Sequence, residues 1–400
     1  MRTLTSERRS TASWLPCLAL ITFAIGTDDF IIAGLLPEIA RDQGVSEAAA
    51  GQLVTAFSVS YALAAPPLAV AMAQFPRKPV VLFGLTAFAM INVVTAFAPN
   101  YGTMMALRIA AALAAASITP AVFALAAQLA SPARVGRAIG VVAAGLTVSL
   151  FVGVPLGSLL GTAFGWRSTF LAVALFTAIV LAASAHYLPA APGAPEIGLR
   201  AQLRILSRPA VLTTVIGTVM GASGGLLVYT YIGPITRAMS GYDGPILAFF
   251  IAVVGVAGAA GTLVGGRLTD RWGADRALLA TFGGMAISLV SLAALGAVVP
   301  SGVPVWLLAG ALALYGFAGW GFNPPMNARM LALAGDGGTE ALALNTSGLY
   351  VGIAVGGAVG GAAVAAAGGV GAAVTAAGMA AVTFAAIAGF VRRYPSAPTA

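Results

Sequence analysis

The sequence predicts an all-α membrane protein with twelve transmembrane helices, arranged as two pseudo-symmetric bundles of six. Hydrophobic residues make up 60% of the 400 residues, charged residues make up 8%, and the mean hydropathy is +0.97. Runs of about 20 apolar residues, each long enough to cross the hydrocarbon core of a bilayer, recur along the whole chain. A membrane β-barrel is excluded because its short strands of alternating polarity are absent from the sequence.

The apolar runs predict the spans in order. Those of the N-terminal half fall at residues 14–36, 50–72, 79–98, 103–127, 137–163 and 167–188, and those of the C-terminal half at 209–233, 245–267, 276–298, 304–329, 340–364 and 368–391. The first run is too long for a signal-peptide core, so we expect a retained span. The longest polar connection lies between the halves, which predicts an N-terminal bundle at 1–188, a cytoplasmic linker at 189–208 and a C-terminal bundle at 209–400.

The lysines and arginines predict the orientation. If the N-terminus is cytoplasmic, the outer connections hold only Arg41, Arg167 and Arg237, and Arg108 lies inside a span. The other sixteen of the 20 basic residues lie in cytoplasmic segments: Arg2, Arg8, Arg9, Arg77, Lys78, Arg134, Arg137, Arg200, Arg204, Arg208, Arg267, Arg271, Arg276, Arg329, Arg392 and Arg393. Because positive loops stay inside, both termini are predicted to be cytoplasmic.

Several functions are made improbable by composition. The single cysteine, Cys17, and the single histidine, His186, exclude a disulfide framework and a dedicated Cys/His metal site. The net charge of +8 comes from scattered basic residues and not from a patch, so no nucleic-acid partner is expected. We expect no metal and no cofactor, and a membrane-embedded enzyme is a weak alternative because catalytic side chains are scarce.

Asp28 and Asp29 stand side by side in the first apolar run. A charge at the membrane centre costs about 2.5–3.5 kcal/mol on insertion scales, so a functional reason for its presence is expected. Burial favours the neutral form of a carboxyl group, and a site that alternates between wet and dry surroundings could therefore take up and release a proton. Neighbouring helix positions point about 100° apart, which predicts separate roles for the two. The alternative is that both lie near a span end and face lipid headgroups or water.

Arg108 is the only cation well inside a predicted span. It is a candidate partner for an intramembrane carboxylate or a donor to substrate. The alternative is a position near the outer end of the fourth span, where its long side chain would reach the interface.

Glycine and proline together mark the fifth span. Gly153, Gly157 and Gly161 recur every fourth residue, a spacing that lets helices approach closely. Pro155 is expected to bend the helix. Pro324 and Pro325 predict a break in the tenth span.

Polar and aromatic residues inside the spans are candidates for a central cavity, because buried amides and phenols need partners. We expect contacts with substrate from Tyr61, Asn92, Tyr229, Tyr231, Trp320, Asn323 and Asn345. Ser58, Asn327 and Tyr350 are further candidates. For each residue taken singly, hydrogen bonding between helices is the alternative.

These stretches resemble the major facilitator superfamily, and within it the bacterial sugar-efflux and chloramphenicol-resistance exporters among the twelve-span drug/proton antiporters. The opening segment 26–40 is similar to their first-span signature, in which Asp29 aligns with the family's carboxylate and Asp28 with a variable position. Segment 266–276 is similar to a cytoplasmic loop of the superfamily, and Arg108 matches the arginine of the fourth-span motif. Segment 153–157 resembles the fifth-span antiporter motif.

The resemblance implies roles for individual residues. Asp29, Asp28 and Arg108 would couple transport to protons, and the gating residues would be Gly153, Pro155, Gly157, Gly266, Asp270, Arg271 and Gly273. The first-half loop departs from the pattern at Ala73 and Pro76, the fourth span at Ala112, and the proline motif by an inserted valine. Some chloramphenicol-type exporters share these departures.

We therefore expect a monomeric secondary transporter in the bacterial inner membrane, with a small organic substrate, protons and the lipid bilayer as partners. It would export a phenicol-, sugar- or nucleoside-like molecule in exchange for protons by alternating access. A facilitator or a proton-coupled importer of a small metabolite is the alternative, because the same fold serves both directions.

Overall fold

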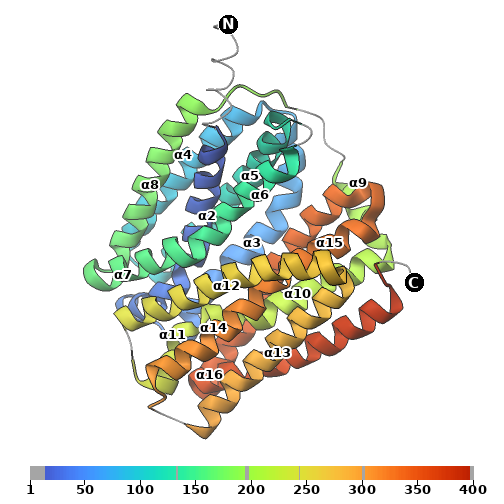
Figure 1. The fold of residues 1–400 in the computed structure, drawn as a ribbon. Coiled ribbons are helices and arrows are strands. Elements are labelled where there is room, and N and C mark those ends of the chain that lie inside the picture. The colour runs from blue at the N-terminus through green and yellow to red at the C-terminus, as the bar shows by residue number, and fades with distance from the viewer. Residues whose placement is uncertain (1–13, 132–133, 194–197, 243, 300–301, 397–400) are drawn as a thin grey trace, which may run out of the picture.

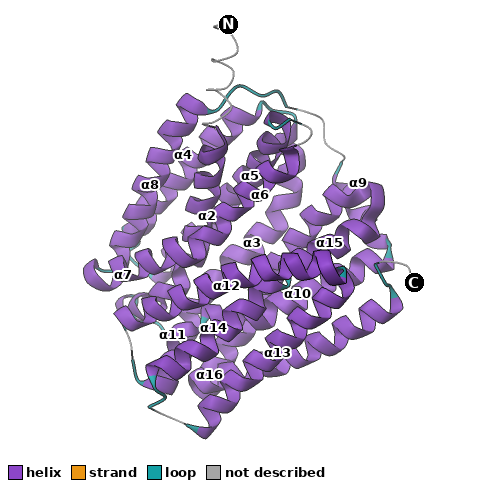
Figure 2. Cartoon of the chain, viewed as in Figure 1, coloured by secondary structure: helices purple, strands orange, loops and turns teal. Residues whose placement is uncertain are grey.

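The computed structural model describes residues 14–131, 134–193, 198–242, 244–299 and 302–396, and these residues form helices and no strand (Figure 2). Within them, eleven segments are long and apolar enough to cross a membrane. The last of these, Glu340–Arg393, is 54 residues long and breaks at Ala367 and Gly368, where the glycine φ is +62°. Each part is long enough to span a bilayer, so the described chain has the twelve predicted spans.

The helices of the first half pack into one bundle (Figure 1). They are α2 (Trp14–Asp42), α3 (Glu47–Ala73), α4 (Arg77–Ala96), α5 (Tyr101–Leu129), α6 (Val135–Val148) with α7 (Val154–Phe164), and α8 (Trp166–Tyr187). The short α9 (Leu199–Arg204) precedes the second bundle. That bundle contains α10 (Pro209–Thr230), α11 (Ile232–Ser240), α12 (Pro245–Trp272), α13 (Ala274–Val298), α14 (Val305–Gly321), α15 (Asn323–Ala334) and α16 (Gly338–Arg393).

Several predicted boundaries differ from the structure, and two of them lie on helices that contribute to the centre of the molecule. The first helix does not end at residue 36 but continues through Pro37 to Asp42. Burial of Leu36, Pro37 and Ile39 against neighbouring helices compensates for the backbone hydrogen bond that proline removes. The seventh span does not end at residue 233 either: α10 stops at Thr230, and α11 continues the chain to Ser240.

The fifth span packs tightly against α2. A side chain on Gly153 would collide with Thr27, and one on Gly157 would displace the end of the Ile31 side chain, so glycine favours this close approach. One turn of π-helix, Ser149–Gly153, separates α6 from α7 immediately before Pro155. This irregular turn accommodates the missing N–H of the proline. The predicted seam of small residues therefore fixes the position of the helix that carries both aspartates.

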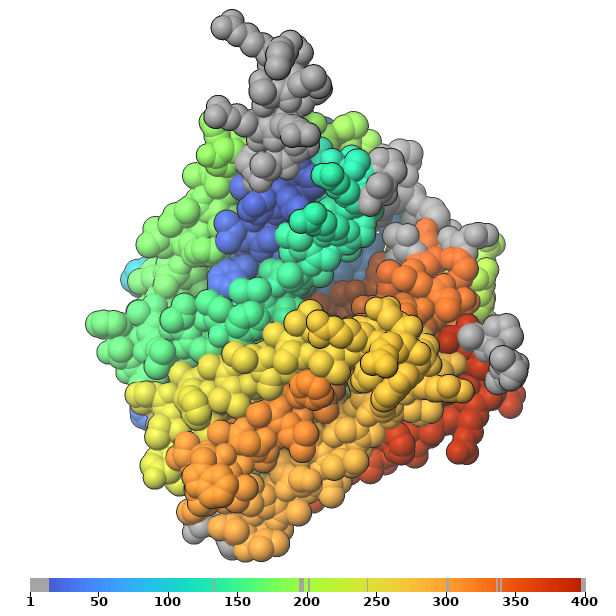
Figure 3. Space-filling model, viewed as in Figure 1, coloured from blue at the N-terminus to red at the C-terminus, as the bar shows by residue number. Residues whose placement is uncertain are grey.

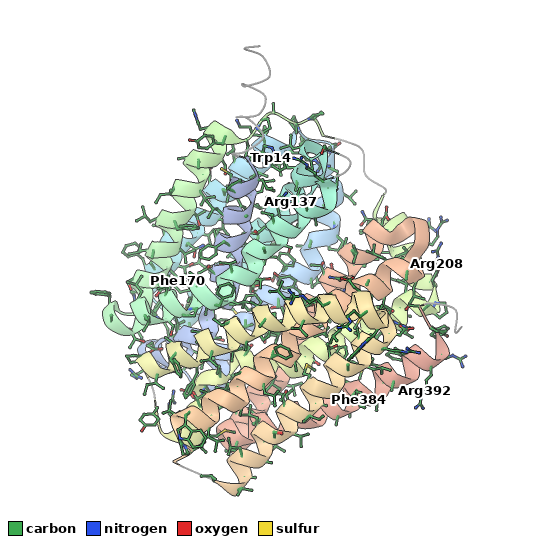
Figure 4. The ribbon with its side chains drawn as sticks, in the orientation of Figure 1. Trp14, Arg137, Phe170, Arg208, Phe384 and Arg392 are labelled. Carbon is green, nitrogen blue, oxygen red and sulfur yellow. The ribbon has the colours of Figure 1, made fainter. Side chains whose placement is uncertain are left out.

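The molecule has two unlike ends. One end holds the start of α2, the helix α9 and the last turn of α16, and we call it the linker end (Figure 1). We call the opposite end the distal end. Arg137, Arg208 and Arg392 all lie at the linker end (Figure 4). Figure 3 shows a hollow between the bundles at this end, between the first turns of α6 (teal) and the last turns of α15 (orange).

The bundles meet at the distal end and at the centre. Helix α16 packs along α3, where Gly357 and Gly361 leave no room for a side chain beside Thr55 and Gln52. The Gln52 side-chain amide donates to the carbonyl of Gly357 at 3.3 Å. Nearer the distal end, the Arg237 guanidinium lies 2.6 Å from the Glu47 carboxylate in the other bundle. The structure is therefore closed on the distal side.

Candidate functional site

Asp28 and Asp29 lie near the middle of α2, and both are buried, at 0% and 1% exposure. The alternative that they face water at a span end is therefore wrong. The extension of α2 to Asp42 explains this, because it moves both residues to the centre of a 29-residue helix. Their side chains diverge as the helix geometry requires, and each meets a different partner.

Asp28 pairs with Arg108 of α5 inside the first bundle. The Nη1 atom of Arg108 lies 2.8 Å from the Oδ2 atom of Asp28, and its other terminal nitrogen donates to the Asp28 carbonyl at 3.1 Å. The guanidinium also lies over the ring of Phe57, 4.6 Å from its centroid. Arg108 is 1% exposed, so the alternative of a side chain reaching the interface is wrong. The pair joins α2 to α5 and balances its own charge.

Asp29 points toward the other bundle. The Tyr350 hydroxyl of α16 donates to its Oδ2 atom at 2.9 Å, while its Oδ1 atom has no hydrogen-bond partner among the described residues. The ring of Tyr61 stacks on that of Tyr350 with centroids 3.9 Å apart. Since Arg108 is hydrogen-bonded to Asp28, no cation forms an ion pair with Asp29 in the described structure.

Two aromatic rings, Phe30 and Tyr229, lie beside Asp29 together with aliphatic side chains. Phe30 packs edge-on against Tyr229 with centroids 5.7 Å apart, and Tyr229 packs against Trp320 at 5.6 Å. The buried Tyr229 hydroxyl has no hydrogen-bond partner among the described residues. A narrow gap beside Asp29, too tight for a water molecule, is lined by Phe30, Ala33, Val54, Leu226, Tyr229, Thr230 and Ile353. The centre of the molecule thus combines one unpaired carboxylate with apolar rings and a free phenol.

The other predicted cavity residues separate into groups. Asn92 is buried beside Asp28, and its amide donates to the carbonyl of Phe88 at 3.0 Å. Tyr231 lies where the bundles touch, donating to the Gly357 carbonyl at 2.7 Å, and not beside Asp29. Asn345 accepts a hydrogen bond from Thr218 at 2.6 Å inside the second bundle.

Asn323 lies at the break in the tenth span. It is the first residue of α15, and its amide donates to the Trp320 carbonyl at 3.4 Å. Asn345 of α16 in turn donates to the exposed Asn327 of α15 at 3.2 Å. Of the predicted residues, the structure thus brings Tyr61 and Tyr229 close to Asp29, packs Trp320 against Tyr229, leaves Asn92 beside Asp28, and separates the others. No group of three or more potential metal ligands occurs among the described residues.

Comparison with known proteins identifies the family. The sequence profile of the Major Facilitator Superfamily matches residues 18–339. The chain belongs to this superfamily. It is therefore a multi-pass membrane transporter, of a class whose members bind small-molecule substrates and often couple their movement to protons.

Individual relatives lie within the same superfamily. The chain is 33% identical to the uncharacterized MFS-type transporter YbcL of Bacillus subtilis, over 84% of this chain and 85% of the relative. It is 34% identical to a chloramphenicol resistance protein of Streptomyces lividans, over 64% of this chain and 66% of the relative. It is 29% identical to the inner membrane transport protein YdhP of Escherichia coli O157:H7, over 85% of this chain and 86% of the relative.

Solved structures of the superfamily share the fold. A bacterial homologue of the human lysosomal transporter Spinster, in an inward-facing and unoccupied conformation, superposes with a TM-score of 0.78 at 15% identity over 98% of this chain and 99% of that one. A D-xylose–proton symporter gives a TM-score of 0.77 at 17% identity, over 97% of this chain and 99% of the symporter. At this identity the likeness supports the helical architecture alone.

The superfamily loop between α12 and α13 carries the predicted gating residues of the second half. Asp270, Arg271 and Gly273 are exposed at the linker end, and Gly266 is half-buried one turn earlier. Neither Asp270 nor Arg271 forms an ion pair with another described residue. Gly273 has a φ of +79°, a conformation that other residues rarely adopt, so it permits the sharp turn between the helices. Gly153, Pro155 and Gly157 lie in the seam against α2.

Sequence reasoning missed several ion pairs, and two of them join distant helices within the second bundle and between the bundles. Arg329 is predicted at the cytoplasmic end of the tenth span, but it lies inside α15, is 1% exposed and pairs with Asp275 of α13. It also donates to the carbonyl of Tyr394 at 2.6 Å, which attaches the end of α16 to the bundle. The ion pair between Glu47 and Arg237 was missed as well. Neither pairing has a signal in the sequence, because each joins helices that are distant along the chain.

Proposed function

We propose that this transporter exports a small organic amphiphile in exchange for protons, and that proton and substrate compete for Asp29. The observation that carries the proposal is the carboxylate of Asp29. It is buried between the two bundles, and no cation forms an ion pair with it in the described structure. Such a charge is costly in a dry surrounding, and it is relieved by a proton or by a hydrogen-bond donor of a bound molecule. A group of this kind can exchange one for the other.

Asp28 and Arg108 take a supporting role in this proposal. They form a buried pair within one bundle, so their mutual charge stays balanced whichever way the bundles move. Removing either partner would leave the other uncompensated. Asp28 is therefore proposed as an auxiliary that holds Arg108, and Arg108 as the residue that fixes α2 and its aspartates against α5.

Aromatic rings around Asp29 support an amphiphilic substrate. Flat apolar faces from Tyr61, Tyr229 and Trp320 suit a small ring or acyl group, while the free Tyr229 hydroxyl and the Oδ1 atom of Asp29 suit a polar one. Asn323 and Asn327, one turn apart on α15, and Asn345, which donates to Asn327, would offer further hydrogen bonds on the entry path. The name of the chloramphenicol resistance relative makes a phenicol the first probe.

The direction of transport rests on the orientation. The basic residues of the linker end favour the cytoplasmic side, which would make both termini cytoplasmic and the hollow in Figure 3 an entrance from the cell interior. In the outward-facing state, the loop containing Gly266, Asp270, Arg271 and Gly273 would close this entrance. The kinked seam at Gly153, Pro155 and Gly157 would let the fifth span follow the movement.

Everted membrane vesicles test the proposal. An imposed pH gradient should collapse when chloramphenicol, a neutral sugar or a nucleoside is added, if one of them is exchanged for protons. Asp29→Asn should abolish this response. Asp42→Asn, at the exposed end of the same helix, should leave it intact and is the matched control. Proton coupling that survives in Asp29→Asn would refute the assignment, and substrate movement without any proton flux would indicate a facilitator.

A further inference from the structure

We propose that Tyr350 is a positioning residue that senses the charge of Asp29 and holds the two bundles together at the centre while that charge is present. The inference rests on the proposed function, since it takes Asp29 as the proton site. It adds a second role to the same contact: the group that carries the proton also controls whether the transporter can change conformation.

The contact crosses the boundary between the bundles. Tyr350 belongs to α16 and is 7% exposed, and its hydroxyl reaches the carboxylate of Asp29 on α2 at 2.9 Å. Tyr61 of α3, in the first bundle, stacks on its ring with centroids 3.9 Å apart. The ring is therefore held in place by the first bundle while its backbone belongs to the second. A movement of one bundle against the other has to break this arrangement.

Tyr350 lies where the closed contact ends. About two and three turns further along α16, Gly357 and Gly361 press against α3 in the closed distal half. About one turn in the other direction, toward the linker end, Thr346 is exposed. The bond to Asp29 thus lies between the closed distal half and an exposed position of the same helix toward the linker end, and we take it as the place where separation of the bundles would begin.

The strength of this bond depends on the charge of its acceptor. A hydrogen bond to an ionised carboxylate is about twice as strong as one to a neutral group. The charged and titratable groups around Asp29 are Asp28 and Arg108 on the first bundle and the phenols Tyr61, Tyr229 and Tyr350. The charge of Arg108 acts on Asp29, although the guanidinium is hydrogen-bonded to Asp28, and Tyr350 is the phenol that donates to the carboxylate.

A coupling rule follows from this geometry. With Asp29 charged and no substrate bound, the Tyr350 bond holds the observed state, and the empty transporter stays as it is. A proton on Asp29 weakens the bond, and a substrate that donates to the carboxylate displaces the phenol. Only these two loaded forms change conformation readily, so proton and substrate movements stay linked.

Tyr231 provides a matched control. It is also a buried phenol between the bundles, and its hydroxyl donates to the carbonyl of Gly357 in its own bundle and accepts from the side-chain amide of Gln52 in the other at 3.5 Å. Neither of these groups titrates. Tyr350→Phe and Tyr231→Phe therefore each remove one hydroxyl from the bundle interface and keep the ring. Only the first removes a bond whose acceptor changes charge.

Spin-label distances between the bundles, measured without substrate across a pH series, test the inference. Labels at Arg137→Cys and Arg392→Cys, both exposed at the linker end, report opening of the hollow, with Cys17 replaced by serine in the background. In the labelled protein without further substitution, the ratio of molecules with an open linker end to those with a closed one should rise about tenfold as the pH rises and Asp29 loses its proton. Tyr350→Phe should reduce this change to less than about threefold. Tyr231→Phe should shift the ratio equally at every pH.

The outcomes separate the two proposals. If Asp29→Asn loses the pH dependence and Tyr350→Phe keeps it, the role of Tyr350 is wrong and the proton site stands. If Asp29→Asn keeps the pH dependence, the proposed function fails. A loss of pH dependence in Tyr231→Phe would also overturn the inference, because any interface phenol would then suffice. As a second measurement, Tyr350→Phe in proteoliposomes should equilibrate substrate without moving protons, and coupled transport in it would contradict the rule.

Discussion

Replacing Arg108 by glutamine should destabilise this transporter much more than replacing Arg108 and Asp28 together. The two side chains are 1% and 0% exposed and 2.8 Å apart at their nearest polar atoms. Without the guanidinium, the carboxylate of Asp28 is left in the protein interior with a charge that no ion pair balances. Asp28→Asn in the same chain removes that charge.

The magnitude follows from burial. Breaking a buried pair by removing one partner costs about 3–5 kcal/mol, much of it from the charge left behind. In the double variant, the loss is limited to the hydrogen bonds and to the contact between the guanidinium and Phe57. We therefore expect an interaction energy between the two positions of about 2 kcal/mol, within the range measured for residues in contact.

A double-mutant cycle measures this energy. The unfolding free energies of the parent, Arg108→Gln, Asp28→Asn and the double variant would be determined by reversible denaturation in mixed micelles. The exposed pair Arg167 and Asp42, 2.7 Å apart but 43% and 41% exposed, provides the control cycle. Its interaction energy should stay below about 1 kcal/mol. Equal interaction energies for the two pairs would refute the argument that burial makes the Arg108 pair costly to break.

Two further predictions concern packing and the distal end. Gly153→Ala should lower the unfolding free energy by about 1–3 kcal/mol, because its new methyl group collides with Thr27. The control Gly140→Ala places its methyl group in open space and should be neutral. Equal melting temperatures for the two variants would contradict this prediction. A short chemical cross-link between cysteines placed at Glu47 and Arg237 should hold the distal end closed and stop transport until it is cleaved, and undiminished transport would show that this end does not open.

The amino-acid sequence by itself determined the twelve spans and the intramembrane position of the two aspartates. Span length and the cost of a buried charge depend only on neighbouring residues, so both can be read locally. The glycine spacing of the fifth span predicted a close helix contact for the same reason. The helix ends were predicted less well, because Pro37 and Tyr231 are accommodated by packing from other helices.

Only the tertiary structure decided which partner each aspartate has. Asp28 and Arg108 are 80 residues apart in the chain, and Asp29 and Tyr350 are 321 apart. The sequence placed all four inside spans, but the rotation of each helix about its axis determines which of them meet. That rotation results from the packing of all the helices together, and no local pattern encodes it. The assignment of one aspartate to a fixed ion pair and the other to the bundle boundary therefore required the folded molecule.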